Sequence, residues 1–335
     1  MRPAALALAI VGALATAAAA APSPEPAVGG KSVREDVYPR APVAFAGGVT
    51  ALPDVEFANL VGFRPLLMDI YRPSAAPKPH PIVLWIHGGG WNRGDSRESG
   101  AFTDYPAALA GLAARGYLVA SVNYRLTGEA RFPAQVQDVN AAILFLKAHA
   151  AAYGGDPGRV FLWGGSAGGQ LAALAALTCG DPAYRPDSSG GRLTHGQQLA
   201  VKPPSGSTCV QGLAAWYGVF DLPALQAVDA SALLGCQPKT CPDVAAKASP
   251  VNRVGPSAPP TLLVHGLADT EVSPDQSKEM AARLEQAGVK VETLYIPGVD
   301  HGLIGKTPDA TRAATLQALR ATYAFFDRLS GQAAH

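Results

Sequence analysis

The chain is organised around the stretch RVFLWGGSAGGQLAALA, which spans residues 159–175. Its apolar start predicts a buried strand, and its Ala/Leu end predicts a helix. Between them lies Gly-Gly-Ser-Ala-Gly, a match to G-x-S-x-G that places Ser166 on a tight turn from strand to helix. Side chains at Gly164 or Gly168 would collide with the opposing strand or helix. The pattern therefore predicts an exposed Ser166 hydroxyl above the sheet, at the positive end of the helix.

The composition narrows the classes of protein to consider. Of 335 residues, 48% are hydrophobic and 16% are charged, which is enough to bury a large core. The formal net charge is +1 and the basic residues form no stripe, so we expect no nucleic acid partner. A chain with 36 glycines also makes some G-x-S-x-G matches by chance. The alternative is therefore a glycine-rich turn between a strand and a helix, in which Ser166 has no catalytic role.

Residues 1–21 begin with Met-Arg-Pro and continue as an almost unbroken run of Ala, Leu and Val. A short cationic start, an apolar stretch and an A-x-A end are typical of a signal peptide, which predicts a secreted or periplasmic protein. A membrane anchor is the alternative. The run is alanine-rich, only about as long as a minimal span and without a charged stop, so we expect no stable membrane span. Residues 22–44, rich in Pro, Ala and Gly, are expected to form an irregular tether.

Export bears on the four cysteines, because an even number in an oxidising compartment predicts disulfides. These are Cys179, Cys209, Cys236 and Cys241, which allow three pairings. Cys236 and Cys241 flank a short Gln-Pro-Lys-Thr loop and favour a local staple, which leaves Cys179 with Cys209. A zinc site is the competing interpretation. The seven histidines supply no closely spaced Cys/His set, so we expect no metal.

From about residue 82 the chain alternates apolar runs with helical patterns. Strands are expected at residues 82–86, 117–122, 160–163, 210–216, 261–266 and 289–296, after an edge strand within 45–60 and another at 66–71. Helices are expected at residues 103–115, 133–152, 166–177, 274–288 and 308–329. This alternation predicts an α/β fold, with a mostly parallel central sheet and helices on both faces. We expect a single domain over residues 45–330, with residues 180–208 as a long irregular insertion near the pocket.

A serine hydroxyl becomes a nucleophile at neutral pH only with a base in reach, a group that holds the base, and donors for the oxyanion. After a G-x-S-x-G turn, the partners should follow in the order acid, then histidine, on loops after strands. His301, in a glycine-flanked loop after the last expected strand, fits the base. Asp269, three residues after Gly266, fits the acid. Glu271 and Asp300 are its rivals, although Asp300 adjoins His301 and neighbouring side chains rarely face each other.

The segment His-Gly-Gly-Gly-Trp at residues 87–91 follows a buried apolar run. Glycines let a backbone approach a tetrahedral centre closely, and such a loop accompanies G-x-S-x-G in esterases. We therefore expect the N–H groups of Gly89, Gly90 and Ala167 to form an oxyanion hole. We interpret His87 as a residue that orders this loop rather than one that acts in catalysis. An ordinary glycine turn is the alternative.

Together these motifs resemble the α/β-hydrolase superfamily, and within it the hormone-sensitive-lipase-like esterases and their bacterial feruloyl-esterase-like relatives. The motifs are His87 to Trp91, Asn123-Tyr124-Arg125, Gly164 to Gly169, Asp269 and His301. The resemblance covers about residues 64–330, and the stretches 67–73, 235–242 and 248–250 also resemble the feruloyl-esterase-like group. Relatives of hormone-sensitive lipase usually carry a longer N-terminal helical cap. The short N-terminal tether therefore implies no large lid and directs attention to residues 180–208.

The resemblance implies a serine carboxylesterase that needs no cofactor or metal. Ser166 would be the nucleophile, His301 the base and Asp269 the group that orients the base. Its partner would be a small-molecule or polysaccharide-linked ester, such as a feruloyl, coumaroyl or acetyl ester of plant polysaccharide, and short-chain or polyester substrates are equally open. Amide hydrolysis, as a peptidase or formamidase, is an alternative because the same triad serves both. A non-catalytic binding protein is a second alternative, which the presence of all three residues disfavours.

Three aromatic residues near the expected site have two interpretations. Trp91, Tyr124 and Trp216 either line a pocket for an acyl or aromatic group or pack in the core.

Overall fold

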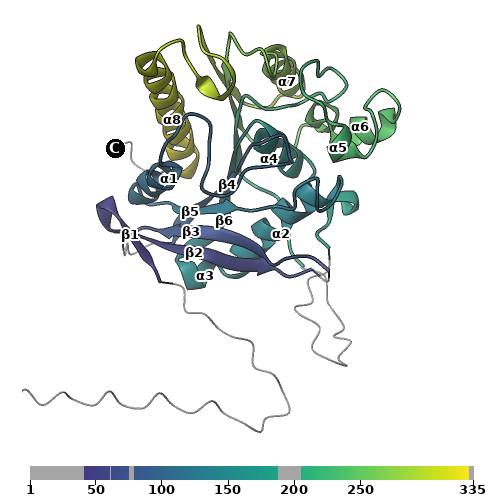
Figure 1. Ribbon diagram of the computed structural model, residues 1–335. Coiled ribbons are helices and arrows are strands. Elements are labelled where there is room, and N and C mark those ends of the chain that lie inside the picture. The colour runs from purple at the N-terminus through teal and green to yellow at the C-terminus, as the bar shows by residue number, and fades with distance from the viewer. Residues whose placement is uncertain (1–40, 61, 75–78, 188–204, 332–335) are drawn as a thin grey trace, which may run out of the picture. The chain divides into compact units, whose positions relative to one another are not determined.

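The computed structural model describes residues 41–60, 62–74, 79–187 and 205–331. Within these ranges nine strands form one sheet, in the order β1-β2-β3-β5-β4-β6-β7-β8-β9 (Figure 1). The strands are β1 (Val43–Phe45), β2 (Val49–Ala58), β3 (Leu66–Arg72), β4 (His80–Ile86), β5 (Leu118–Val122), β6 (Gly155–Gly165), β7 (Gly212–Trp216), β8 (Thr261–Gly266) and β9 (Val291–Ile296). The α-helices are α1 (Tyr105–Ala114), α2 (Ala134–Ala148), α3 (Ala150–Tyr153), α4 (Ala167–Leu177), α5 (Ser231–Leu234), α6 (Pro242–Ala248), α7 (Asp275–Gln286) and α8 (Pro308–Ser330).

The sheet is mostly parallel, which confirms the expected α/β architecture. β5, β4, β6, β7, β8 and β9 pair in parallel, whereas β1, β2 and β3 form an antiparallel edge that joins β5. Parallel strands end at the same edge of a sheet, and ligands of open α/β sheets bind there. The loops after β4, β6, β8 and β9 therefore meet at one edge, and they carry the residues that the sequence singled out.

The continuous apolar runs arise because both faces of the central strands are buried. In β4, Ile82, Leu84 and Ile86 pack in one core cluster with side chains of α2 and α4. Val83 and Trp85 point the other way, into a second cluster with side chains of α1 and α8. Figure 1 shows these helix pairs on opposite sides of the sheet. A strand covered on both faces has no polar alternation, as expected of a parallel sheet.

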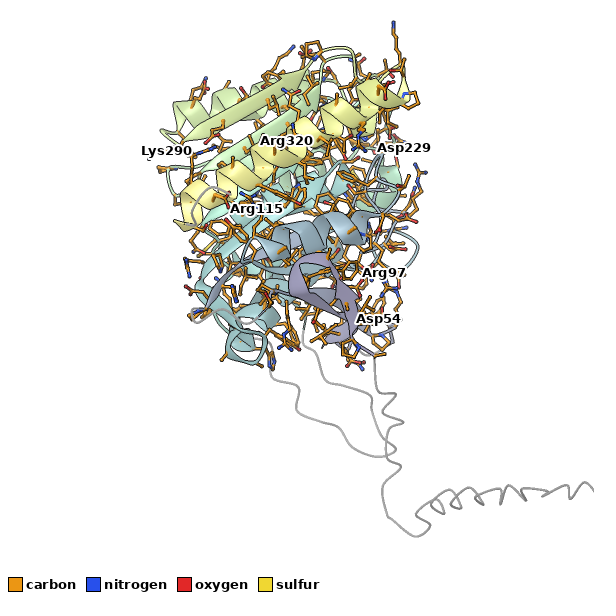
Figure 2. The ribbon with its side chains drawn as sticks, turned by 90° about the vertical axis from the view of Figure 1, so that its left-hand side faces the viewer. Asp54, Arg97, Arg115, Asp229, Lys290 and Arg320 are labelled. Carbon is orange, nitrogen blue, oxygen red and sulfur yellow. A yellow bond between two sulfur atoms is a disulfide. The ribbon has the colours of Figure 1, made fainter. Side chains whose placement is uncertain are left out.

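Two sets of charged contacts lie on the face of the sheet that α1 and α8 cover (Figure 2). Arg115, at the end of α1, pairs with Asp327 of α8, and Tyr117 Oη donates to the same carboxylate at 2.9 Å. At the antiparallel edge, Arg97 donates to the buried Asp69 of β3 through Nε at 2.7 Å and Nη2 at 2.9 Å. Arg97 Nη2 also lies 3.0 Å from Asp54 Oδ1 of β2. The two ion pairs of Arg97 fix the long loop after β4 onto β2 and β3.

Several boundaries differ from the sequence expectations. β1 begins at Val43, inside the stretch expected to be a tether. It is a largely exposed edge strand of three residues paired with β2, which is too short for an alternating pattern to identify it. The helix expected over 133–152 is divided at His149 into α2 and α3. Within the insertion, residues 182–184 form a short 3₁₀ turn. The expected signal peptide and residues 22–40 lie outside the described residues. Among those described, no helix has both the length and the apolarity to cross a membrane.

The cysteines form two pairs at disulfide distance. Cys179 and Cys209 have their Cα atoms 4.8 Å apart and close the insertion, 30 residues apart in sequence. Cys236 and Cys241 have their Cα atoms 6.3 Å apart and connect α5 to α6, five residues apart. Both Cα distances lie within the range of protein disulfides.

These two loop lengths predict unequal effects on stability. A cross-link over about 30 residues removes more chain entropy from the unfolded state than one over five, by about 3.6 against about 2 kcal/mol. We expect the pair Cys179→Ser/Cys209→Ser to lower the free energy of unfolding more than Cys236→Ser/Cys241→Ser. Urea unfolding of both variants would measure this, and excess reductant should abolish the difference. Equal losses would contradict the entropic account.

Candidate active site

Ser166 lies at the junction of β6 and α4, between Gly165 and Ala167. Its backbone has φ 55° and ψ −124°, a conformation that a residue with a side chain adopts only under strain. Two backbone bonds hold it: Ser166 N donates to Trp216 O at 2.9 Å, and Gln170 N donates to Ser166 O at 3.1 Å. The turn thus sets the serine at the N-terminus of α4.

The outer glycines of G-x-S-x-G are required by close approach of backbones. A Cβ on Gly164 would lie 2.3 Å from Gly168 O, and a Cβ on Gly168 would lie 2.1 Å from Ile86 O. Both distances are far below any real contact of a Cβ atom, and the atoms met are backbone atoms that cannot move aside. Next to Ser166, the backbone of α4 therefore packs directly against the backbones of β4 and β6, with no side chain between them.

His301 follows β9 and faces Ser166. Its Nε2 lies 2.9 Å from Ser166 Oγ, and its Nδ1 lies 2.8 Å from Asp269 Oδ2. The His301 side chain is 17% exposed, so the site remains open to solvent on this side. The edge of the His301 ring contacts the ring of Tyr217, with 5.0 Å between centroids. Asp269 is ionised and accepts from Nδ1–H, which leaves Nε2 as the acceptor for the serine hydroxyl.

Asp269 is buried after β8 and carries four hydrogen bonds. Oδ1 accepts from Glu271 N at 3.0 Å and Val272 N at 2.8 Å. Oδ2 accepts from His301 Nδ1 and, at 3.1 Å, from His265 Nε2. Burial by itself raises the pKa of the Asp269 carboxyl, but the hydrogen bonds from His265 and His301 outweigh it and hold this pKa well below its usual range.

The two rival acids are placed elsewhere. Asp300 Oδ1 accepts from Thr270 N and from His301 N, each at 2.8 Å, and so ties the loop after β8 to the loop after β9. Glu271 is exposed, and its carboxylate takes no part in the hydrogen bonds among the described residues. The structure therefore brings Asp269, rather than Asp300 or Glu271, to the ring of His301.

The loop after β4 passes directly beside the serine. A Cβ on Gly88 would lie 3.2 Å from Ser166 Cβ. Gly89 and Gly90 have φ values of 101° and 58°, in the left-handed region that favours glycine. Among the hydrogen bonds of the described residues, none is donated by the N–H of Gly89 or Gly90. The N–H of Ala167, the first residue of α4 and the neighbour of Ser166, has no intrahelical acceptor.

His87 holds this loop in place through contacts of its ring. Its Nδ1 lies 2.7 Å from Gly88 O, and its ring stacks on Tyr124 at 4.3 Å between centroids. Burial lowers the pKa of His87 to about 4, against a smaller opposing effect of the hydrogen bond to Gly88. The imidazole is therefore neutral at pH 7, and no hydrogen bond joins it to Ser166, His301 or Asp269.

Backbone strain gathers around the same edge of the sheet. Among the described residues, five that are not glycine have a positive φ: Asp54, Trp91, Ser166, Tyr217 and Leu303. Four of the five belong to the site: Ser166 itself, Trp91 after Gly90, Tyr217 against the His301 ring, and Leu303 two residues after His301. Each strained residue costs about 1–3 kcal/mol and persists only where its surroundings over-determine it. Neither Tyr217 nor Leu303 is predicted to have a role from the residue patterns, because no pattern of residue types reports φ.

The three aromatic residues considered for a pocket are core residues. Trp91, Tyr124 and Trp216 are at most 1% exposed and line neither of the described cavities. Trp91 Nε1 donates to Gln170 at 2.9 Å, and Trp216 Nε1 donates to Thr322 of α8 at 2.9 Å. Tyr124 Oη donates to His87 O at 3.1 Å. Of the two interpretations, these contacts favour packing in the core, because each ring is buried and its polar atom bonds to a neighbouring element.

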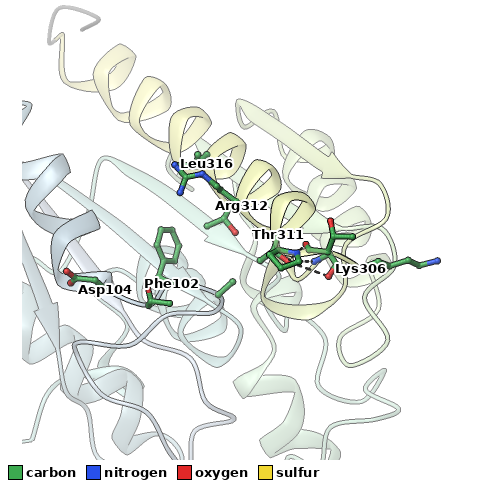
Figure 3. Close-up of a pocket in the computed structure, with 12 residues that line it drawn as sticks. Phe102, Asp104, Lys306, Thr311, Arg312 and Leu316 are labelled. Carbon is green, nitrogen blue, oxygen red and sulfur yellow. Dashed lines mark hydrogen bonds between the residues drawn. The ribbon is translucent and has the colours of Figure 1, made fainter.

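A cavity of about 560 Å³ lies between the loop before α1 and the start of α8, and Figure 3 shows the residues that line it. Phe102 and Asp104 lie on one side, and Thr311 and Arg312 lie on α8. Its lining includes residues 305–308, which follow the His301 loop, and does not include Ser166. Among the described residues, no group of three or more His, Cys, Asp or Glu side chains is arranged to hold a metal ion.

The insertion at residues 180–208 reaches the site edge at one described end. Asp187 Oδ2 lies 3.1 Å from Arg125 Nη2, in the loop that carries Tyr124. The other end, at residues 205–208, lies beside α2 and lines a second cavity of about 350 Å³. Residues 188–204 lie outside the described residues, so the expectation that they rim the pocket remains a prediction.

Comparison with known proteins gives a family match. The BD-FAE family model matches residues 68–284. Esterase LipC of Mycobacterium tuberculosis (strain ATCC 25618 / H37Rv) is 31% identical over 246 residues, 70% of this chain and 56% of LipC. Esterase LipQ of the same strain is 32% identical over 250 residues, 72% of this chain and 55% of LipQ. The chain thus spans little more than half the length of these curated relatives.

Solved structures show the same fold. A truncated form of a carbohydrate esterase from gut microbiota is 28% identical with a TM-score of 0.67, covering 84% of this chain and 96% of that chain. An acetyl ester-xyloside bifunctional hydrolase from Caldicellulosiruptor lactoaceticus has a TM-score of 0.67 at 23% identity, covering 83% of this chain and 96% of that chain. At 23% identity the second likeness bears on the fold alone.

The backbone contact at Gly168 predicts a large cost for the smallest substitution. We expect Gly168→Ala to lower the free energy of unfolding by about 3 kcal/mol or more, because the added methyl meets rigid carbonyl groups. Gly255→Ala is the matched control, since a Cβ there has no neighbour within 4 Å. Urea unfolding of both variants measures the difference. A Gly168→Ala protein as stable as the control would refute the contact.

The lowered pKa of Asp269 predicts a pH-dependent contribution to stability. A carboxyl with a depressed folded pKa stabilises the fold fully above its unfolded pKa of about 3.9, and the contribution is lost as pH falls. We expect Asp269→Asn to be less stable than the wild type at pH 7, with the gap narrowing below about pH 4. Unfolding measured from pH 7 to pH 3 tests this. A gap that widens in acid would contradict it.

Proposed function

The chain belongs to the BD-FAE family of α/β-hydrolases, and from this membership and the site geometry we propose that it is a serine carboxylesterase. The observation that carries the proposal is one hydrogen-bonded row. Ser166 Oγ lies 2.9 Å from His301 Nε2, and His301 Nδ1 lies 2.8 Å from Asp269 Oδ2. The names of LipC and LipQ, both esterases, support it.

In the proposed reaction, Ser166 Oγ attacks the ester carbonyl carbon while His301 Nε2 takes its proton. Asp269 holds the tautomer with Nδ1–H and stabilises the imidazolium that forms. His301 then returns the proton to the leaving alcohol, and the acyl group remains on Ser166. Water repeats the sequence on the acyl-enzyme, which releases the acid and restores the serine. No cofactor takes part in these steps.

The developing oxyanion is proposed to accept from the N–H groups of Gly89, Gly90 and Ala167. Their freedom from other acceptors supports this role, because a donor already engaged in the fold is not available to the transition state. The N-terminus of α4 adds its partial positive charge at the same place. Removal of one such donor typically costs about 10²–10³-fold in kcat.

For the substrate we propose a small-molecule or polysaccharide-linked ester, with feruloyl, coumaroyl or acetyl as the acyl group. The carbohydrate esterase relative at 28% identity supports an ester borne on carbohydrate. We further propose that residues 1–21 are a signal peptide and that residues 45–330 act as one catalytic domain outside the cytoplasm. The two cysteine pairs at disulfide distance support an oxidising location.

Loss of the nucleophile should remove the activity. We expect purified Ser166→Ala to lose at least about 10⁴-fold in turnover of p-nitrophenyl acetate, because only the binding groups and oxyanion donors remain. A fluorophosphonate probe should label the wild type and leave the variant unlabelled. Unfolding curves serve as the control for folding. A variant with wild-type turnover would exclude Ser166 as the nucleophile.

A substrate panel separates ester hydrolysis from its alternatives. Matched p-nitrophenyl esters and p-nitroanilides with acetyl, butyryl and feruloyl groups should show ester cleavage well ahead of anilide cleavage. Faster cleavage of the anilides would assign an amide hydrolase. Absence of both cleavage and probe labelling would assign a binding protein on a hydrolase scaffold.

A further inference from the structure

A second histidine contacts the carboxylate that holds His301. His265 ends the apolar run of β8 and is completely buried. Its Nε2 lies 3.1 Å from Asp269 Oδ2 and 2.9 Å from Val272 O. Its Nδ1 lies 2.7 Å from Ser277 Oγ of α7. A buried polar side chain is costly unless it is hydrogen-bonded, and here both ring nitrogens have partners.

The partners settle which nitrogen carries the proton. A carbonyl oxygen and an ionised carboxylate are acceptors only, so Nε2 of His265 must be a donor. A serine hydroxyl donates or accepts, so it can donate to an unprotonated Nδ1. Of the two neutral tautomers, the one with Nε2–H is therefore the one that fits all three contacts. His301 takes the opposite tautomer, with Nδ1–H directed at the same carboxylate.

The two imidazoles share one oxygen atom. Oδ2 of Asp269 accepts from His301 on the solvent side and from His265 on the core side, while Oδ1 accepts from two backbone N–H groups. This arrangement leaves the carboxylate no freedom to turn about its terminal bond. The negative charge of Oδ2 is also shared between two N–H donors. One donor, the catalytic histidine itself, is enough for the carboxylate of a triad to hold that histidine.

We propose that His265 is a positioning residue for the hydrolysis proposed above: a buried imidazole that fixes the Asp269 carboxylate and withdraws part of its charge from His301. Without it, the charge of Oδ2 is balanced by His301 alone, which favours the imidazolium form of His301. The enzyme would then need a higher pH before His301 becomes the neutral base. This inference rests on the proposed function, because the consequence is expressed through His301 acting as that base.

The other charged groups facing this row stay in one state through the working range. Asp300 donates no proton there, since hydrogen bonds from the backbone of Thr270 and His301 lower its pKa. Burial raises the pKa of Tyr217 to about 12, so the phenol against His301 is neutral. Asp269 is ionised. Glu271 contributes its backbone N–H to the site, and its side chain is exposed. A shift of the acid limb of activity therefore reports on His301.

Kinetics of three variants test the inference. We expect His265→Leu to lower kcat by roughly 10- to 100-fold with little change in KM, since misplacing a reacting group by about 1 Å costs about 10²-fold. The acid limb of kcat/KM against pH should move to higher pH. His265→Gln, which places an amide N–H near the position of Nε2, should restore most of both. His80→Leu is the control: it removes another buried histidine, bonded to Gly116 O at the opposite edge, and should leave both parameters unchanged.

A folded His265→Leu protein with wild-type kcat and acid limb would overturn the inference. So would equal losses in His265→Leu and His265→Gln, because a structural role alone gives no rescue by a hydrogen-bond donor.

A measurement without turnover keeps the test open if the variants fail to fold. Imidazole ¹⁵N spectra of the wild-type protein should show a proton on Nε2 of His265, as its two acceptors require. The proton on Nε2 of His265 should exchange slowly with solvent, as is typical of a buried hydrogen bond. The Nδ1–H tautomer for His265 would overturn the inference. If wild-type protein cleaves no ester, the proposed function fails, and the tautomer still reports whether His265 holds Asp269.

Discussion

The contact between the backbones of β4, β6 and α4 is the constraint on which the site depends. At Gly168 the first turn of α4 approaches Ile86 so closely that a single methyl group would meet the carbonyl oxygen at 2.1 Å. The same junction holds Ser166 at positive φ and brings Gly88 against its Cβ. Ser166, Gly88 and the first turn of α4 are therefore fixed relative to one another. None of them can shift without separating α4 from β4 and β6.

The sequence was enough to predict the sheet and the elements that carry the site. Apolar runs without alternation indicated buried parallel strands, because both faces of β4 and β6 are covered. The antiparallel edge was harder to place. β1 is largely exposed and β2 is only partly buried, so neither has the alternation that identifies a strand. Chain order along these strands also led to Ser166, Asp269 and His301, whose side chains the structure sets within hydrogen-bond distance.

What the sequence left out depends on side-chain direction. Trp91, Tyr124 and Trp216 stand next to site loops in sequence, yet each ring turns into the core, where it buries most area. His265 was hidden for the opposite reason. It lies in the strand Thr261–Gly266 directly after an apolar run, and its residue pattern indicates only a buried strand. Its ring nitrogens nevertheless reach Asp269 and Ser277. Residue type and spacing locate a loop, but only the three-dimensional structure shows which side chains enter it.

The cysteine pair at the ends of the insertion has a consequence for the helix that carries Ser166 at its start. Cys179 and Cys209 hold their Cα atoms 4.8 Å apart, about the spacing of neighbouring strands. Cys179 lies two residues after the end of α4, and Cys209 lies three residues before β7. The helix α4 is therefore anchored at both ends, by backbone contacts at Gly168 and by a covalent cross-link beyond Leu177.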